Sequence, residues 1–182
     1  MAKNKKDDIV QAAYGLFLEH GYDNSSIKKI AERAGVSQGL IYNFFESKEM
    51  LFDAVLSMAQ DSFQSKMIAV ARKYADAPPE EYIERYADVI LENREEANFI
   101  LNSALTPKLR HRAEPLLKEY SNGVMQTIAP LFPSVPNELL YNIGSLLLAL
   151  SDSLLIDGDK ERAVRTGVFA VKMFKRYLNA SE

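Results

Sequence analysis

Residues 26–48 read SIKKIAERAGVSQGLIYNFFESK, and this stretch decides the fold. Two short segments with helical spacing of apolar residues, Ile27–Ala34 and about Gln38–Phe45, are separated by a turn that contains Gly35. Two short helices joined by a turn of three or four residues with glycine form a helix-turn-helix. We therefore predict this motif over about residues 26–45. Small or apolar residues are expected to fill the space between its helices: Ala31, Val36, Ile41 and Phe44.

Serine residues stand where the helices around this motif should begin. Ser25 or Ser26 precedes the first short helix, Ser37 precedes the second, and Ser47 precedes a longer one. A serine at this position accepts a hydrogen bond from a backbone N–H group of the first turn. Upstream, an apolar stripe predicts a further helix that Gly21 stops: Ile9, Ala12, Ala13, Leu16 and Phe17.

The second helix of the motif separates a polar face from an apolar one. At about 100° per residue, Gln38, Gly39, Tyr42 and Asn43 cluster opposite the apolar residues Leu40, Ile41, Phe44 and Phe45. Glutamine and asparagine side chains can bond adenine bidentately in the major groove, and glycine lets the backbone approach closely. The Tyr42 hydroxyl can donate to a phosphate. An ordinary solvated polar face is the alternative interpretation.

Lysines lie in the first turns of these helices, where a cation opposes the helix dipole. Lys28 and Lys29 begin the first short helix, and Lys48 follows Ser47. Free N–H groups and an ammonium group attract the same anion, so such helix starts suit a phosphate. Isolated surface lysines carry no such meaning, but beside a polar reading face they favour DNA binding.

The chain beyond residue 48 is predicted to be helical as well, with no alternating strand pattern. Breaks are expected at Pro78-Pro79, at Thr106-Pro107 and over Pro130–Pro136. The last two helices should span about 137–156 and 160–178. We therefore predict an all-α protein with a DNA-binding head (1–48) and a larger helical body (49–182).

The last two predicted helices carry an unusually broad apolar surface, which must be covered on most sides. A homodimer interface built from both subunits explains this excess, and a buried core helix of a monomer is the alternative. The residues predicted to form the interface are Leu139, Ile143, Leu146, Leu147, Leu150, Leu154, Val164, Val168, Val171 and Phe174.

A small-molecule pocket in the body would have apolar and aromatic walls with a few polar groups. Plain core packing is the alternative for any single wall residue, and the sequence does not identify the ligand. The predicted wall residues are Phe63, Met67, Tyr82, Tyr86, Phe99, Tyr120 and Met125.

Composition narrows the class of protein without pointing to DNA. The net charge is −3, and the absence of cysteine excludes disulfides and thiolate metal sites, which suits a reducing cytosol. The charged first residues do not read as a targeting segment. The most apolar stretch, Ile143–Ile156, is shorter than the roughly 20 residues of a membrane span. We expect a cytoplasmic protein with no membrane partner.

An enzyme is the main alternative class. His20 and His111 are the only histidines, and no HExxH motif, phosphate loop or nucleophile elbow is present. No catalytic residue, metal site or cofactor is therefore predicted. A protein-interaction module that reuses the three-helix head without DNA is a further alternative.

Residues 9–51 resemble the tetracycline-repressor (TetR) family. The resemblance rests on Ala12-Ala13, Leu16-Phe17, Gly21-Tyr22, Ser26-Ile27, Ile30-Ala31, Ala34-Gly35-Val36-Ser37, Gly39, Ile41-Tyr42, Phe45 and Ser47-Lys48-Glu49. It implies an Ω-shaped homodimer of nine-helix subunits that represses transcription until a small molecule binds the body. Activation by the same head is the alternative.

Matching positions in the family imply roles for individual residues of the head. Ser25 or Ser26, Tyr42 and Lys48 would contact phosphates, and Gln38, Gly39 and Asn43 would contact bases or backbone. Ser25-Ser26 stands where threonine is common, and Asn43 where histidine or tyrosine is frequent, which leaves the operator sequence open. A two-fold symmetric dimer would read a near-palindromic operator with half-sites about 34–36 Å apart.

Overall fold

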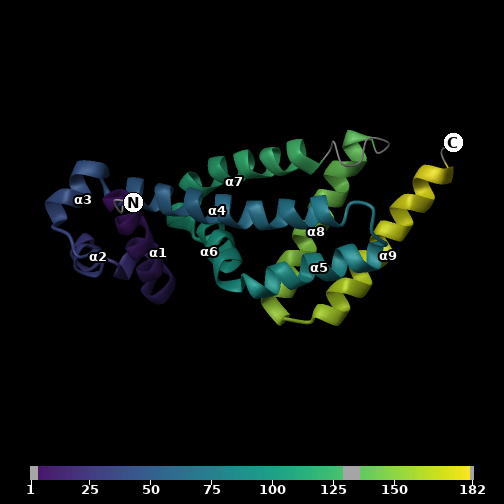
Figure 1. The fold of residues 1–182 in the computed structure, drawn as a ribbon, viewed down its shortest axis with the longest axis horizontal. Coiled ribbons are helices and arrows are strands. Elements are labelled where there is room, and N and C mark those ends of the chain that lie inside the picture. The colour runs from purple at the N-terminus through teal and green to yellow at the C-terminus, as the bar shows by residue number, and fades with distance from the viewer. Residues whose placement is uncertain (1–3, 129–135, 181–182) are drawn as a thin grey trace.

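The computed structural model describes residues 4–128 and 136–180, and all its regular structure within these ranges is helical (Figure 1). The head contains three helices: α1 (Lys5–Asn24), α2 (Ile27–Ala34) and α3 (Gln38–Phe44). Six more form the body: α4 (Lys48–Lys73), α5 (Pro79–Glu92), α6 (Arg94–Leu105), α7 (Pro107–Ile128), α8 (Asn137–Asp157) and α9 (Lys160–Ala180). The all-α prediction is confirmed.

The predicted caps and the predicted turn are present in the head. The side chains of Ser26, Ser37 and Ser47 accept hydrogen bonds from the N–H groups of Lys29, Leu40 and Met50, at 3.3, 3.1 and 3.2 Å. Gly35 ends α2 with a φ of +63°, a left-handed conformation that costs glycine little. These local signals position α2 and α3 as the sequence predicts.

Gly21 acts differently from the prediction. It adopts a φ of +75° and a ψ of 166°, but the chain resumes a helical turn after it and α1 continues to Asn24. The glycine therefore introduces a kink near the end of α1 rather than a stop. This kink turns Tyr22 and Ser25 toward other parts of the protein, as described below.

A continuous hydrophobic core joins the head to the body. Residues of α1, α2 and α3, including Ile9, Ile30 and Ile41, are fully buried in the same cluster as Leu51 and Leu56 of α4. The predicted boundary after residue 48 coincides with the start of α4, but the packing continues across it. The division into two domains stays a prediction.

The body helices form two groups (Figure 1). Helices α6 and α7 pack against α4, which runs away from the head, whereas α8 and α9 pack against α5 and each other. Gly167 of α9 permits one close approach, because a Cβ atom there would lie 2.8 Å from Ile83 Cγ2 and 3.0 Å from Leu150 Cδ1. Lys160 of α9 also contacts Asp88 of α5 at 2.6 Å.

Helix α8 is more apolar than the sequence analysis allowed. Its segment Leu139–Asp157 has 19 residues and a mean hydropathy of 1.7, which is long and apolar enough to cross a membrane by length and composition alone. A single helix of this kind is weak evidence for a span, because the core helix of a soluble protein can be equally long and apolar. Leu139, Leu140, Leu150 and Leu154 of α8 are buried within the chain.

Candidate nucleic-acid interface

Helix α3 presents the expected polar face to solvent. Tyr42 is 52% exposed, and Gln38, Gly39 and Asn43 are also exposed. Ile41 anchors the opposite side of the helix at 0% exposure. A short helix with a fixed buried edge can therefore offer two amide groups and one phenol to a partner. Their contact with DNA stays a prediction.

Phe44 does not fill the space between the helices, and this correction follows from where α3 ends. Phe44 is the last residue of α3 and is 40% exposed. Phe45 has extended backbone, with a φ of −137°, and its ring is buried instead. Because the chain leaves the helix at this point, the second phenylalanine takes the core position and the first joins the exposed surface.

The start of α2 shows which of Ser25 and Ser26 caps this helix, a choice that the sequence left open. Ser26 is exposed and caps α2, and Lys28 is exposed in the first turn. Ser25 is 0% exposed, and its hydroxyl lies 2.9 Å from the carbonyl oxygen of Leu16 and 2.8 Å from that of Gly21. The predicted phosphate contact of Ser25 is wrong for this conformation, because its hydroxyl already bonds the kinked end of α1.

Lys48 is half-buried, in contrast to the free cation that the sequence suggests. Its Nζ donates to the carbonyl oxygen of Tyr22 at 2.5 Å and lies 4.1 Å from the centroid of the Tyr22 ring. Burial lowers the pKa of this ammonium group. The same tyrosine donates its hydroxyl to Glu49 Oε1 at 3.0 Å. Lys48 therefore binds the end of α1 in this structure.

An ion pair fixes α2 against α1, and sequence reasoning did not single it out. The Arg33 guanidinium donates to both carboxylate oxygens of Glu19, at 2.8 and 2.5 Å, and it lowers the pKa of that carboxyl. It lies over Gly15, where a Cβ atom would be 3.2 Å from the guanidinium carbon. Glu19 and Arg33 are far apart in sequence, so only a prediction of how the helices cross would have paired them.

Several predicted pocket residues pack against other side chains in the described part of the chain. Phe99 packs its ring against Tyr14 of the head at 5.3 Å and against Phe52 at 6.0 Å. Phe63 and Met67 are buried in the hydrophobic core. Burial raises the pKa of Tyr82 to about 12. Phe99 therefore packs as a core residue between head and body in this structure, and its assignment to a ligand wall stays a prediction.

Two further predicted wall residues lie on α7. Met125 is half-buried, and its sulfur would lie 3.4 Å from a Cβ atom at Gly144. The side chain of Tyr120 lies outside the described residues.

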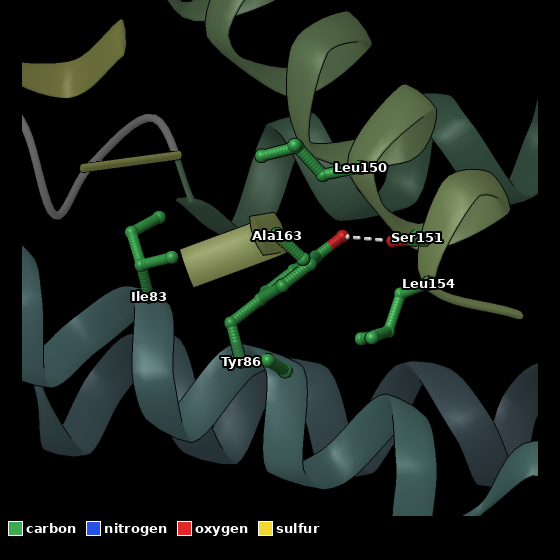
Figure 2. A pocket seen from close by; sticks show the side chains of 7 residues that line it. Ile83, Tyr86, Leu150, Ser151, Leu154 and Ala163 are labelled. Carbon is green, nitrogen blue, oxygen red and sulfur yellow. Dashed lines mark hydrogen bonds between the residues drawn. The ribbon is translucent and has the colours of Figure 1, made fainter. Parts of the chain in front are cut away.

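A small cavity lies between α5, α8 and α9 (Figure 2). Its volume of about 10 Å³ is close to the room that one water molecule needs. The Tyr86 hydroxyl lies 2.8 Å from Ser151 Oγ and donates to the Leu147 carbonyl oxygen at 3.2 Å. The cavity is lined by Ile83, Tyr86, Ala87, Leu150, Ser151, Leu154 and Ala163. Tyr86 is thus the predicted wall residue that this cavity contains.

The predicted dimerisation residues fall into two classes. Leu139, Leu150 and Leu154 are buried inside the single chain, so they cannot face a partner, and this part of the prediction is wrong. The partly buried residues remain candidates: Leu146, Leu147, Val164, Val168 and Val171. The side chains of Ile143 and Phe174 lie outside the described residues. Sequence reasoning missed the apolar side chains that are most exposed among the described residues of α8 and α9, which are Tyr141, Leu148, Ile156, Phe169 and Met173.

Comparisons with known proteins agree with this geometry. Residues 9–55 match the family described as bacterial regulatory proteins, tetR family. The HTH-type transcriptional repressor AcnR of Corynebacterium efficiens is 31% identical over 80 residues, which cover 41% of this chain and 43% of AcnR. The chain spans about a third to a half of the length of the curated relatives it matches first.

Solved structures resemble nearly the whole fold. A transcriptional regulator from Rhodococcus sp. Rha1 has a TM-score of 0.74 at 18% identity, covering 92% of this chain and 95% of its own. A TetR-family transcriptional regulator from Streptomyces coelicolor has a TM-score of 0.71 at 18% identity, covering 98% of this chain and 83% of its own. Residues 9–55 therefore carry the N-terminal domain of the tetR family, and the fold of the whole chain resembles solved transcriptional regulators.

Proposed function

We propose that the protein is a sequence-specific DNA-binding transcriptional regulator that represses its target genes from a near-palindromic operator. One observation carries the proposal: α3 holds an exposed face of amide and phenol groups, fixed from behind by fully buried Ile41. The relative AcnR is named a repressor, and so is DhaR from Mycobacterium sp. strain GP1, which favours repression over activation.

The contacts with DNA follow from which side chains are exposed. Gln38 and Asn43 would read base edges in the major groove, while Gly39 allows the backbone to approach. Ser26 and Tyr42 would bond phosphates. Lys28 would add a cation at the start of α2, where the helix dipole also attracts an anion.

Two copies of the chain would present two reading helices to one operator. The exposed apolar side chains of α8 and α9, such as Ile156 at 78% and Phe169 at 66%, would be covered by a second subunit. Half-sites about 34–36 Å apart would then match one turn of the duplex. The assembly would act in the cytoplasm.

Release by a small molecule would complete the regulatory cycle. An effector that binds the body better in one arrangement of α4 shifts the population toward that arrangement. A change in the separation of the heads would then prevent both from docking together. The proposed neighbours of that ligand are Phe63, Met67, Tyr82, Tyr86, Phe99, Tyr120 and Met125.

Selection of bound duplexes from a random pool tests the proposal directly. We expect one near-palindromic sequence to be enriched, and its affinity to fall steeply with salt. Tyr42→Ala should weaken binding to all sequences, whereas Gln38→Ala should relax the preference for one base pair. Gln64→Ala, on α4 in the body, is the matched control and should change neither. A pool that shows no enriched sequence at low salt would refute the proposal.

A further inference from the structure

Tyr22, near the end of α1, lies where the head meets α4 and the first turn of α7. Its ring packs against Phe17 at 5.6 Å and against Phe52 at 5.3 Å, so α1 and α4 share one aromatic cluster. Phe52 in turn contacts Phe99 of α6. The kink at Gly21 places the Tyr22 carbonyl and hydroxyl near polar groups of the body.

Two lysines from different helices approach this one ring. Lys48 of α4 lies 4.1 Å from the ring centroid and bonds the Tyr22 carbonyl, while Lys108 of α7 lies 5.6 Å from the same centroid. Lys108 also pairs with Asp23 at 2.5 Å. The chain thus brings a residue of the first turn of α7 back to the end of α1.

A second ion pair joins α7 to α4 one turn further along. Arg112 of α7 contacts the carboxylate of Asp53, and both side chains are about one-third exposed. Helix α7 is therefore held to α1 by Lys108 and to α4 by Arg112. An aromatic ring that touches two ammonium groups gains an electrostatic attraction from each of them.

We propose that the first turns of α7 and Lys48 together clamp Tyr22, and that this clamp sets the orientation of the reading head relative to the body. Lys108, Tyr22 and Lys48 are positioning residues, because they hold the head without touching its exposed reading face. Through this clamp a displacement of α7 would reach the head as well as a displacement of α4. This clamp acts in the protein without DNA, and it goes beyond the proposed function.

A distance measurement between spin labels tests the clamp without any DNA. The chain has no cysteine, so Glu32→Cys in α2 and Glu92→Cys in α5 provide two exposed labelling sites, one in the head and one in the body. Labelled chain is mixed with an excess of unlabelled chain, so that only distances within one subunit are measured, and we then expect one narrow distance distribution in the parent. Lys108→Ala should broaden or shift it by about 2 Å, beyond the roughly 1 Å of thermal motion in a rigid core.

Matched variants separate positioning from general loss of structure. Lys108→Arg should retain the narrow distribution, because it keeps the cation, and Lys118→Ala changes an exposed lysine of the same helix and should have no effect.

Salt offers a second test on the unmutated clamp. The Lys108–Asp23 pair is well exposed, with side chains 63% and 69% accessible, so high salt should screen it and broaden the distribution in the parent. Lys108→Ala should then show little further response to salt. An unchanged distribution in Lys108→Ala at low salt, with helix content and melting temperature equal to those of the parent, would overturn the proposal.

Discussion

Ser25→Ala and Ser26→Ala should separate the stability of the head from its affinity for DNA. Ser25 is fully buried, and one hydroxyl proton lies between two carbonyl oxygens, at 2.9 and 2.8 Å. Its removal costs about one hydrogen bond in a site that water cannot reach, or about 1–2 kcal/mol. For a chain of this size, that corresponds to a fall in melting temperature of about 2–8 °C.

Thermal unfolding followed by circular dichroism measures this loss of stability. Binding to a selected duplex at 20 °C measures the affinity for DNA. Ser25→Ala should bind DNA as tightly as the parent, since its hydroxyl lies inside the protein. Ser26→Ala should lose about 1 kcal/mol of stability as an N-cap and should also bind DNA more weakly. A Ser25→Ala protein with normal melting temperature but weakened DNA binding would refute this reasoning.

Three further outcomes test other parts of the structure. Gly167→Ala should destabilise the protein by about 1–2 kcal/mol in urea unfolding, because its Cβ would press on Ile83 and Leu150 and this overpacking outweighs the gain in helix propensity. Phe169→Glu should shift the sedimentation coefficient toward a single chain while helix content is kept; an unchanged coefficient would count against the proposed interface. Burial raises the pKa of Tyr82 to about 12, so the folded protein holds the phenol proton more tightly than the unfolded chain does. Stability should therefore fall as pH rises above about 10, the pKa of the unfolded chain, and Tyr82→Phe should reduce that loss.

The local features of the head could be predicted because their causes are local. Ser37 and Ser47 cap helices through N–H groups three residues away, and Gly35 turns the chain by its own conformation. Which of Ser25 and Ser26 is exposed could not be predicted from neighbouring residues alone. It depended on the kink at Gly21, which brings Ser25 under carbonyl groups of α1.

The body was less predictable because its sequence pattern does not say which partner covers which face. Helix α8 is apolar on several sides, so periodicity could not separate Leu154, buried within the chain, from Leu148, which is 50% exposed. An aromatic residue such as Phe99 suits a ligand wall and a packed core equally well, and in the structure its ring packs on Tyr14. Contacts between distant segments, such as Lys108 with Asp23, leave no trace in spacing.

The energetics of the head–body junction indicate how a ligand could act on it. A shift from 1:99 to 99:1 between two arrangements needs about 5.5 kcal/mol of differential binding, which one effector can supply. Exposed ion pairs such as Lys108–Asp23 oppose such a shift only weakly. The rings of Phe17, Tyr22 and Phe52 bury apolar area that separation would expose, and this cost is larger. The head should therefore pivot about its aromatic contacts while exposed ion pairs such as Lys108–Asp23 break and re-form. It should remain packed on α4 throughout.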